Sequence, residues 1–479
     1  MTFFMTLVMT MSSAEAVNPP PDLGKKLEEQ IRRAGFKAGE VGVWVSDGET
    51  MIYGLQPEKK FIPASLSKVP TAAAVLGLLP QGHKFKTTFA ATSESGIAAN
   101  GTVTGGVLKG SLYLVGGGDP SFVSESMWFL VNELTRTGVR TIEGDLIVDD
   151  SRFDTIRFGE DRQSRRVDRA YDAPLGAMSL NWNAVTAWVR PAVKSGEAAE
   201  VSLDVMTPFL KIQNQSKTVS GRSNTVWVER MATKDGAQGE TFLVSGNVPQ
   251  GRGEAAFYKS IREPDFWSGH AAIKFLAERG IVVKGTVKTG KVPAGAQTLA
   301  TFESKPLAAI VADMMKWSNN YVADMLIKNI SAESGDLPGT TGKGMVRARE
   351  YIEKKAGLKQ GEYEFINGAG FTRENLFSPR QMGSILNSVR TDFRVFPEFL
   401  ASLPIAGVDG TLRSRFRGME SRGWIRAKTG LLNGVIGLAG YAGDEKGRIY
   451  TFVFVFNGAA GKEDSARQLF DRLATTLVK

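Results

Sequence analysis

Segments typical of β-strands at both ends of the chain constrain its fold more than any other feature. Residues 41–46 and 51–53 flank an Asp-Gly turn and predict a β-hairpin. Residues 431–441 and 449–456 predict two further strands, and residues 467–478 predict a final helix. If both pairs of strands lie in one antiparallel sheet, the middle of the chain leaves that sheet and later returns to it.

The middle of the chain differs from its two ends in composition. Residues 84–255 are rich in Gly, Thr, Ser and Val in short runs, which favours β-structure. A chain of 479 residues is also too long for one ordinary domain. We therefore predict an α/β (α+β) catalytic domain, an antiparallel sheet flanked by helices, built from residues 22–83 and 256–479. Residues 84–255 are predicted to form a large β-rich inserted region of one or two subdomains.

The composition restricts the chemistry available to the chain. It has no cysteine, which excludes disulfides, thiolate nucleophiles and Cys-ligated metals. Its two histidines are His83, in a polar turn, and His270, in a segment with helical spacing, and we expect both to be structural or solvated. A hydrolase of this composition would take its general base from lysine. We expect neither a metal nor another cofactor.

The formal net charge of +9 raises the question of polyanionic partners. Lys and Arg are spread along the chain without a dense basic run, and no nucleic-acid-binding motif is present. We therefore expect no nucleic acid partner. Peripheral association with polyanionic material of a bacterial envelope fits the charge.

The N-terminus has some features of an export signal. Residues 1–16 are Met-rich and apolar and end in Ala14-Glu15-Ala16, a small-x-small cleavage pattern. The apolar run is short, is broken by threonines and has no Lys or Arg before it, so either the signal is weak or the true start codon lies upstream. We predict that residues 1–16 are a signal peptide and that the mature protein is periplasmic or otherwise exported. No later segment has the roughly 20 apolar residues of a membrane span.

A nucleophile and a base are predicted at the start of one apolar helix, which we expect from Pro63 to Leu79. Ser65 and Lys68 are three residues apart and share a face of its first turn. A lysine whose pKa is lowered can accept the serine proton, and the helix N-terminus favours negative charge. About two Ser-x-x-Lys matches are expected by chance in such a chain. What favours this single match is its position, at the start of an apolar helix that follows a hairpin and a proline. Pro70 is expected to bend the helix.

Acyl-transfer enzymes of the penicillin-recognising type add a Ser-x-Asn motif after the nucleophile. Three candidates begin at Ser179, Ser245 and Ser318. Only Ser318-Asn319-Asn320 interrupts an apolar helical stripe, which places polar groups beside a packed scaffold. We select Ser318 and Asn320 and interpret the other two as structural loops.

The third motif of such enzymes is Lys-Ser/Thr-Gly. Candidates begin at Lys194, Lys288 and Lys428. Lys428-Thr429-Gly430 is the one followed by a long apolar strand and a return strand, as expected for an edge strand that lines a cleft. The other two run into polar or loop-forming residues and are interpreted as structural loops.

Longer segments around these motifs resemble the D-alanyl-D-alanine carboxypeptidase/endopeptidase family, the low-molecular-mass class C penicillin-binding proteins. The resemblance covers nearly the whole chain, and the separation of about 250 residues between the first two motifs is similar to that family. The segments that carry it are Phe61–Lys68, Gly118–Pro120, Met178–Asn183, Leu403–Leu412 and Arg426–Gly430.

The resemblance implies a penicillin-binding transpeptidase/β-lactamase-like domain and a role for each motif residue. Ser65 would be the acyl-enzyme nucleophile and Lys68 its general base. Ser318 and Asn320 would relay protons and position the substrate. The backbone N–H groups of Ser65 and Leu431 would form the oxyanion hole.

The family also implies the substrate. Lys428 and Thr429 would bind the terminal carboxylate of a peptidoglycan stem peptide, with Gly430 and Leu431 beside it. The expected activity is a serine DD-peptidase that cleaves D-Ala-D-Ala, D-Ala-diamino-acid crosslinks, or both. β-Lactam antibiotics would bind covalently to the same serine.

Two segments depart from the family pattern. Asn319 stands where the family often has Asp. Asn367, Ala369 and Phe371 differ from a segment that usually reads Asp-Gly-Ser-Gly-Leu-Ser-Arg. We expect the core chemistry to persist and the substrate preference near that loop to differ.

Two alternative functions remain open from the sequence. A β-lactamase-like hydrolase would use the same nucleophile, but class A enzymes add a Glu-x-x-Leu-Asn loop, which is absent after Ser318. We therefore expect slow deacylation. A non-catalytic cell-wall-binding module would tolerate loss of Ser65, and the intact motifs argue against it.

Overall fold

The computed structural model describes residues 20–479 apart from 49, 99–100, 159–167 and 232–238. The predicted signal peptide, residues 1–16, lies outside the described residues. Among the helices in these ranges, none has the length and apolar character needed to cross a membrane.

One antiparallel sheet joins the two ends of the chain, as the sequence predicts. β1 from the start of the chain pairs with β19 from its end, with Val41 opposite Phe456. The prediction that the opening and closing strands share a sheet is confirmed. In spatial order the strands are β17 (Ile425–Leu432), β18 (Val435–Gly443), β19 (Ile449–Asn457), β1 (Val41–Ser46) and β2 (Met51–Leu55).

The predicted strand over residues 431–441 is wrong in its bounds. The chain turns at Asn433 and Gly434, so that β17 ends at Leu432 and β18 begins at Val435. Asn-Gly is a strong hairpin signal, which the apolar residues on both sides of it obscured. As a result, Lys428-Thr429-Gly430 lies within the edge strand rather than before it.

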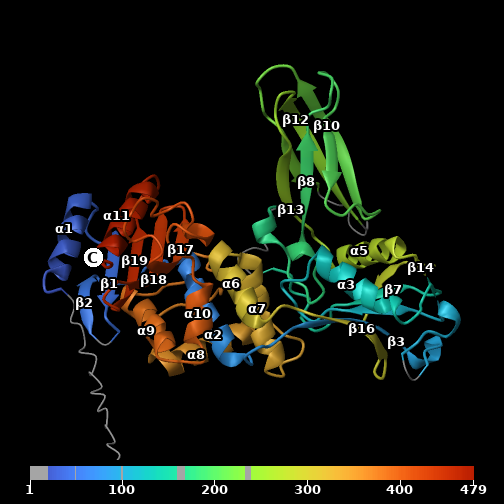
Figure 1. The fold of residues 1–479 in the computed structure, drawn as a ribbon, viewed down its shortest axis with the longest axis horizontal. Coiled ribbons are helices and arrows are strands. Elements are labelled where there is room, and N and C mark those ends of the chain that lie inside the picture. The colour runs from blue at the N-terminus through green and yellow to red at the C-terminus, as the bar shows by residue number, and fades with distance from the viewer. Residues whose placement is uncertain (1–19, 49, 99–100, 159–167, 232–238) are drawn as a thin grey trace, which may run out of the picture.

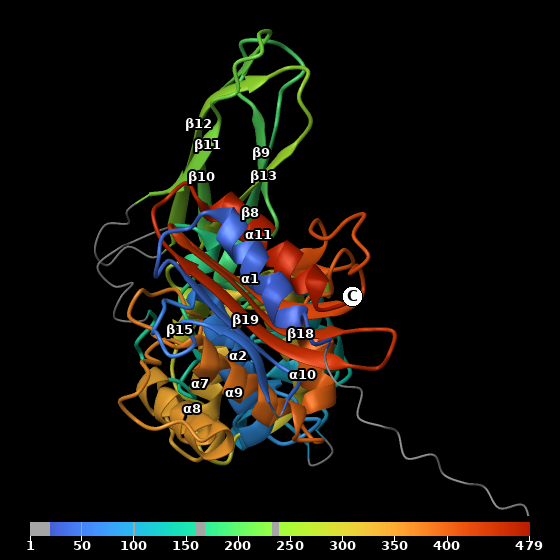
Figure 2. The same cartoon turned by 90° about the vertical axis from the view of Figure 1, so that its left-hand side faces the viewer.

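Helices cover both faces of this sheet (Figure 2). Phe452, Phe454 and Phe456 of β19 pack toward α1 and α11, whereas Val453 and Val455 pack into the core on the other side. The first face carries α1 (Leu23–Ala34) and α11 (Glu463–Thr476). On the second side α9 (Pro379–Arg390) contacts β1, β18 and β19. It shares one core with α2 (Lys68–Leu78), α6 (Leu307–Trp317), α7 (Asn320–Glu333), α8 (Thr341–Ala356) and α10 (Phe396–Ser402).

The inserted region has a body and a projection (Figure 1). The body contains a mixed sheet in the order β15 (Val287–Thr289), β7 (Leu146–Asp149), β5 (Leu112–Val115), β3 (Lys86–Ala91) and β16 (Gln297–Glu303). It also contains α3 (Ser124–Thr135), α5 (Pro264–Glu278) and a small sheet of β14 (Val282–Val283), β6 (Thr141–Ile142) and β4 (Val107–Leu108).

The projection stands above the body in Figure 1 and consists of two three-stranded sheets. One contains β10 (Leu210–Val219), β12 (Glu240–Pro249) and β11 (Trp227–Arg230), and the other β13 (Ala255–Ser260), β8 (Ala184–Arg190) and β9 (Glu200–Leu203). Short 3₁₀ turns connect elements: η1 (Ala64–Ser67), η2 (Ser93–Ser95), η3 (Thr104–Gly106), η4 (Ala170–Asp172), η5 (Asn181–Asn183) and η6 (Gly410–Leu412).

The predicted end of the inserted region at residue 255 does not match this strand pairing. β13 pairs with β8, β15 with β7 and β16 with β3, so residues up to Glu303 belong with the inserted strands. The helices that share the core of the catalytic sheet resume with α6 at Leu307. The predicted boundary is too early because helical spacing was taken to mark the return to the catalytic domain. The first helix with that spacing, α5, belongs to the inserted body.

Candidate active site

Ser65 lies on the 3₁₀ turn η1, directly before α2, rather than inside one long helix as predicted. The turn is held tightly from behind: a Cβ on Gly370, where φ is +73°, would lie 2.0 Å from the carbonyl oxygen of Ala64. Pro70 is the third residue of α2. The first N–H groups of an α-helix have no acceptor within the helix, so a proline at this position removes no hydrogen bond from it. The expected bend is therefore not required.

Lys68 is buried, and its ammonium group has three acceptors close by. Its Nζ lies 3.3 Å from Ser65 Oγ, 2.7 Å from Asn320 Oδ1 and 2.5 Å from the carbonyl oxygen of Ala369. These contacts join η1, the start of α7 and a loop about 300 residues further along the chain. The serine and lysine of the first motif are thus within reach of one another for proton transfer.

The second motif occupies the break between α6 and α7. Ser318 ends α6 in the left-handed conformation, with φ of +57°, and Asn320 begins α7. Asn319 between them caps α7, because its Oδ1 accepts a hydrogen bond of 3.1 Å from the N–H of Val322. Asn and Asp are equally good N-caps, so the departure from the family at this position preserves the local structure.

Lys428 reaches from the edge strand β17 toward the second motif. Its Nζ donates hydrogen bonds to Ser318 Oγ at 2.9 Å and to the carbonyl oxygen of Thr429 at 2.7 Å. Complete burial and the nearby charge of Lys68 lower the pKa of Lys428 well below its ordinary value. A lysine that gives up its proton readily is therefore hydrogen-bonded to the Ser318 hydroxyl.

Gly430 and Thr429 determine how β17 borders the site. A Cβ on Gly430 would lie 2.7 Å from the carbonyl oxygen of Pro63, so the strand and η1 can approach this closely only at a glycine. Thr429 Oγ1 forms a hydrogen bond of 2.8 Å with Thr411 Oγ1 in η6. Leu431 follows and is 59% exposed. Sequence patterns assign Thr411 no role beyond the resemblance of its segment to the family.

Sequence reasoning missed the residue that supports the site from behind. Asn375 is fully buried, and its Nδ2 donates hydrogen bonds to Ser67 Oγ at 2.8 Å and to the carbonyl oxygen of Asn367 at 2.7 Å. Its Oδ1 accepts from the N–H groups of Ile366 and Asn367. Asn375 thereby fixes the loop that presents the Ala369 carbonyl to Lys68. Only the resemblance of this segment to a family motif pointed to it.

The same loop explains why Asn367 can replace the usual Asp. Its Oδ1 accepts hydrogen bonds from the N–H groups of Gly370 at 2.8 Å and Phe371 at 3.2 Å. These bonds require an acceptor oxygen, which Asn and Asp both supply. The exposed ring of Phe371 contacts Tyr171 of the inserted region, with ring centroids 5.6 Å apart.

The rejected motif matches lie away from this site, but not all are loops. Lys288 lies in β15 and pairs with Asp145 at 2.7 Å, and Ser245 lies in β12, so the loop prediction is wrong for both. Ser179 is buried, and its hydroxyl donates to the Gly176 carbonyl oxygen at 2.7 Å. Lys194 follows β8 in a loop, as predicted.

The two histidines lie apart from the motif residues. His83 Nε2 is 3.5 Å from a carboxylate oxygen of Glu333, and its ring lies edge-on to Phe85. His270 stacks on Phe209. Across the part of the chain that the structure describes, no group of three His, Asp or Glu side chains is arranged to hold a metal ion.

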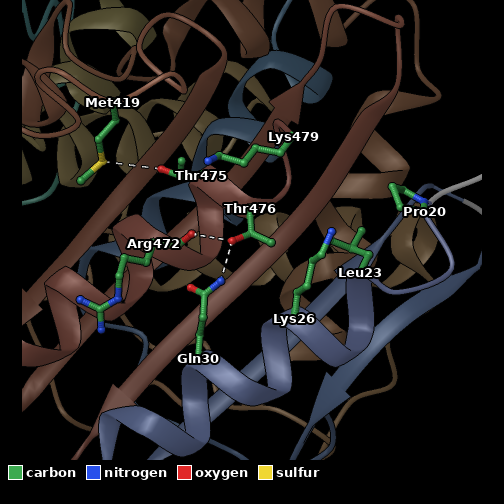
Figure 3. A pocket seen from close by; sticks show the side chains of 9 residues that line it. All are labelled: Pro20, Leu23, Lys26, Gln30, Met419, Arg472, Thr475, Thr476 and Lys479. Carbon is green, nitrogen blue, oxygen red and sulfur yellow. Dashed lines mark hydrogen bonds between the residues drawn. The ribbon is translucent and has the colours of Figure 1, made fainter.

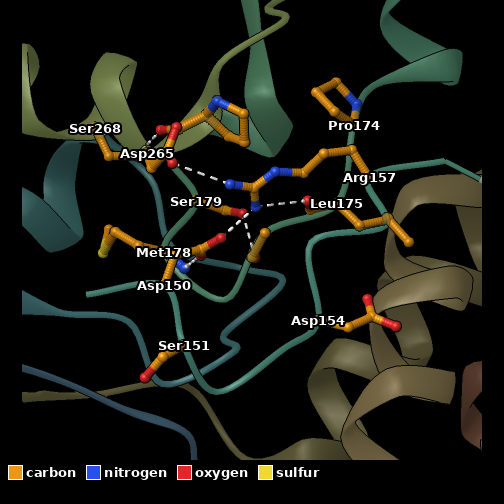
Figure 4. A network of polar contacts seen from close by, with 12 residues as sticks. Asp150, Ser151, Asp154, Arg157, Pro174, Leu175, Met178, Ser179, Asp265 and Ser268 are labelled. Carbon is orange, nitrogen blue, oxygen red and sulfur yellow. Dashed lines mark hydrogen bonds and ion pairs between the residues drawn. The ribbon is translucent and has the colours of Figure 1, made fainter. Parts of the chain in front are cut away.

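A buried ion-pair network lies within the inserted region (Figure 4). Arg157 pairs with Asp150 and, at 3.0 Å, with Asp265, and it donates to the carbonyl oxygen of Leu175 at 3.1 Å. Asp150 also accepts a hydrogen bond of 2.6 Å from the N–H of Met178. Burial raises the pKa of Asp150 to about 6 even though Arg157 opposes this. The network fixes the chain segment that leads into η5.

Three hollows differ in their relation to the motif residues. One of about 790 Å³ begins at Ser318 and Asn320 and extends to the inserted region. Another of about 700 Å³ is bordered by Leu431 at the end of β17. A third of about 450 Å³ lies between α1 and α11, where Lys26 and Arg472 are among the lining residues (Figure 3), and it includes none of the motif residues. The first two border candidate site residues, Ser318 and Asn320 in one and Leu431 in the other.

Comparison with known proteins identifies the family. Residues 23–477 match the model of the D-Ala-D-Ala carboxypeptidase 3 (S13) family. The chain belongs to this family. It is therefore a serine-type D-Ala-D-Ala carboxypeptidase, as the resemblance in its sequence implies.

Curated relatives and solved structures agree with this assignment. The chain is 32% identical over 460 residues to a D-alanyl-D-alanine carboxypeptidase of an Actinomadura species, covering 93% of this chain and 82% of that protein. It is 26% identical to the carboxypeptidase DacB of Haemophilus influenzae, covering 95% and 91%.

The fold also matches solved structures. The crystal structure of penicillin binding protein 4 (dacB) from Haemophilus influenzae matches with a TM-score of 0.77 and 23% identity, covering 94% of this chain and 99% of that one. A predatory peptidoglycan endopeptidase from Bdellovibrio bacteriovorus matches with a TM-score of 0.54 and 19% identity, covering 92% and 93%. The predicted penicillin-binding fold is confirmed.

Proposed function

We propose that the chain hydrolyses D-Ala bonds of peptidoglycan stem peptides through an acyl-enzyme on Ser65. The observation that carries the proposal is the meeting of two Ser–Lys pairs. Ser65 lies 3.3 Å from Lys68 Nζ, and Ser318 lies 2.9 Å from Lys428 Nζ, with the four residues drawn from three distant segments. One pair suits removal of a proton from a nucleophile, and the other suits delivery of a proton to a leaving group.

In the proposed reaction, Lys68 first releases its ammonium proton to solvent and then takes the proton of Ser65 as Oγ attacks the carbonyl carbon of the penultimate D-Ala. The backbone N–H groups of Ser65 and Leu431 stabilise the oxyanion, and loss of one such donor costs about 100- to 1,000-fold in rate. The C–N bond then breaks, and Ser318 passes a proton from Lys428 to the departing amine. Water then attacks the ester carbonyl and passes a proton to Lys428, and the ester C–O bond breaks as Ser65 Oγ takes its proton back from Lys68.

The remaining motif residues position the substrate. Asn320 holds Lys68 through its Oδ1 and leaves its amide N–H groups to face the peptide. The resemblance assigns the terminal carboxylate to Lys428 and Thr429. We propose that Thr429 binds it through a hydroxyl oriented by Thr411, and that Lys428, whose Nζ is bonded to Ser318 Oγ, serves instead as the proton source. Gly430 keeps β17 close enough to Ser65 for a peptide to lie along the strand edge.

Carboxypeptidase and endopeptidase activity differ only in the amine that leaves, and we propose that this site serves both. The proposal draws support from relatives described as carboxypeptidases and from a structural match described as a peptidoglycan endopeptidase. We also propose covalent binding of β-lactams at Ser65. The Haemophilus influenzae protein has been solved in complex with a β-lactam, and a Bdellovibrio bacteriovorus endopeptidase has been solved acylated by penicillin G.

We propose that the mature protein acts outside the cytoplasm. Its proposed substrate is assembled into the wall beyond the membrane, and the sequence ahead of Val17 has the cleavage pattern of a signal peptide.

The test is product release from defined muropeptides. Purified wild-type protein should release D-Ala from a pentapeptide muropeptide and monomers from a crosslinked dimer, and Ser65→Ala should release neither. Products that persist in Ser65→Ala would overturn the proposal. Rapid turnover of penicillin by the wild type would favour the β-lactamase alternative instead.

A further inference from the structure

Exposed aromatic rings surround the hollow that begins at Ser318. Trp182, Tyr258 and Trp317 all line it, and these residues are 43%, 62% and 62% exposed. They come from η5, β13 and the end of α6, so two belong to the inserted region and one to the catalytic domain. Large aromatic side chains gathered on a concave surface are a feature of binding sites rather than of ordinary protein surface.

The backbone presents Trp182 in an unfavourable conformation. Asn181, Trp182 and Asn183 have φ values of +51°, +56° and +51°, so three consecutive residues other than glycine are left-handed. This conformation is rare and costly for residues with a Cβ. It persists only where surrounding contacts hold it, and such strain is concentrated at functional sites.

The contacts that hold η5 involve the two asparagines that flank the tryptophan. Asn183 is fully buried and donates to the carbonyl oxygen of Pro174 at 2.8 Å and to Ser179 Oγ at 2.9 Å. The side chain of Asn181 accepts from the N–H of Ser124 and donates to its hydroxyl, both at 2.9 Å. The neighbours of Trp182 are therefore fixed, while its own ring faces the hollow. The strain serves the presentation of this ring.

The other lining residues restrict the ligand. No Lys or Arg lines the hollow, all of whose lining residues are among those described, and the carboxylates of Glu125 and Asp204 are present. Asp204 is held in place because it accepts hydrogen bonds from the N–H of Thr186 at 2.9 Å and Trp188 Nε1 at 2.7 Å. An anionic ligand would be repelled. A sugar ring fits, since its C–H face stacks on aromatic rings and its hydroxyls donate to carboxylates.

We propose that this hollow, the saccharide groove of Trp182, Asp204, Tyr258 and Trp317, binds a neutral N-acetylated hexose of the glycan strand that carries the substrate peptide. The inference rests on the proposed function, because it takes the peptide at Ser65 to be attached to glycan. The groove is continuous with Ser318 and Asn320 of the candidate site. A stem peptide of four residues spans at most about 14 Å, so its glycan stays close to the protein when its end is at Ser65.

The experiment compares one peptide with and without its sugar. The substrates are a free stem pentapeptide and the same pentapeptide on an N-acetylglucosaminyl-N-acetylmuramyl disaccharide, and kcat/KM for D-Ala release is measured on each. Wild type should prefer the sugar-bearing substrate, and Trp182→Ala should lower that preference about 10-fold, the contribution of one stacking contact. Trp182→Phe, which keeps an aromatic ring, should retain most of it.

Trp227→Ala is the matched control. Trp227 is 42% exposed on β11 and does not line the groove, so its replacement should leave the preference unchanged. If Trp182→Ala fails to fold, as judged by thermal unfolding, Tyr258→Ala on β13 is the second variant and should also lower the preference. Titration with chitotetraose, a sugar without peptide, should quench the tryptophan fluorescence of wild type more than that of Trp182→Phe.

The outcomes separate this inference from the proposed function. Penicillin acylation of each variant reports on Ser65 without any sugar, so a wild type that is not acylated contradicts the proposed function. Equal kcat/KM for the two substrates in an acylation-competent wild type would overturn the saccharide groove. So would an equal loss on both substrates in Trp182→Ala, which would mean that the groove contacts peptide or a free amine.

Discussion

A single methyl group on Gly430 should displace the nucleophile. The added Cβ would lie 2.7 Å from the carbonyl oxygen of Pro63, 3.4 Å from Leu66 Cγ and 3.5 Å from Ala64 Cβ. Relaxed carbon–oxygen contacts in proteins begin at about 3.3 Å, so β17 and η1 would have to separate by roughly 0.6 Å. Because Pro63 directly precedes η1, Ser65 would move with it.

The expected effect on the reaction follows from that displacement. A misplacement of about 1 Å can cost about 100-fold in rate, so we expect Gly430→Ala to slow acylation about 10- to 100-fold. Overpacking of this kind costs about 1–3 kcal/mol of stability, which leaves a protein of this size folded. Stopped-flow measurement of acylation by a fluorescent penicillin gives the rate constant, and thermal unfolding gives the stability.

The control is another glycine of the same sheet. A Cβ on Gly443, at the end of β18, would meet nothing closer than 3.8 Å, so Gly443→Ala should be acylated at the wild-type rate. A Gly430→Ala protein that is acylated within twofold of wild type would refute the idea that close approach of β17 positions Ser65.

Three further substitutions test other parts of the site. Asn375→Ala removes a buried amide with four hydrogen bonds, and we expect about 3–4 kcal/mol lower stability in denaturant unfolding and slower acylation. Thr411→Val removes the partner of the Thr429 hydroxyl, and should raise KM for peptides with a free terminal carboxylate several-fold while penicillin acylation changes less. Burial raises the pKa of Asp119 from 3.8 to about 6, with hydrogen bonds from Ser121 opposing it. The folded state therefore holds a proton that the unfolded state releases, and this stabilisation is complete below about pH 4 and lost as the pH rises through 6. When the pH is lowered from 7 to 5, protonation of Asp119 should raise the free energy of unfolding of the wild type by about 1.3 kcal/mol. Asp119→Asn should lack this gain.

Each of these has a result that would count against it. If Asn375→Ala is acylated at the wild-type rate, the loop holding Ala369 does not position Lys68. An unchanged KM for Thr411→Val would show that Thr411 of η6 does not contribute to binding of the substrate carboxylate. Parallel pH–stability curves for wild type and Asp119→Asn would remove Asp119 as the source of the acid stabilisation.

The motif residues could be found from the sequence because their order along the chain carries information. Strands at both ends and a helix after Pro63 predicted a single sheet, and that sheet then favoured Lys428 over Lys194 and Lys288. The polar break at Ser318 within an apolar stripe was equally local. Each of these signals lies within a dozen residues, the range over which hydrophobic periodicity operates.

The supporting contacts could not be found in the same way. Asn375 bonds to Ser67 across 308 positions, and Ala369 accepts from Lys68 across 301, and such pairs leave no periodic signature. The end of the inserted region was missed because α5 has the same helical pattern whichever sheet it covers. Trp182 likewise has no local signal, since its left-handed backbone depends on bonds to Ser124 and Pro174.

The most direct test of the account is the location of the covalent bond. After brief incubation with penicillin, intact-mass spectrometry of the wild-type protein should show one added penicilloyl group, and peptide mapping should place it on Ser65. The adduct should persist for longer than the incubation and be absent from Ser65→Ala. A penicilloyl group on another serine, or an adduct that survives in Ser65→Ala, would contradict the assignment of Ser65 as the nucleophile.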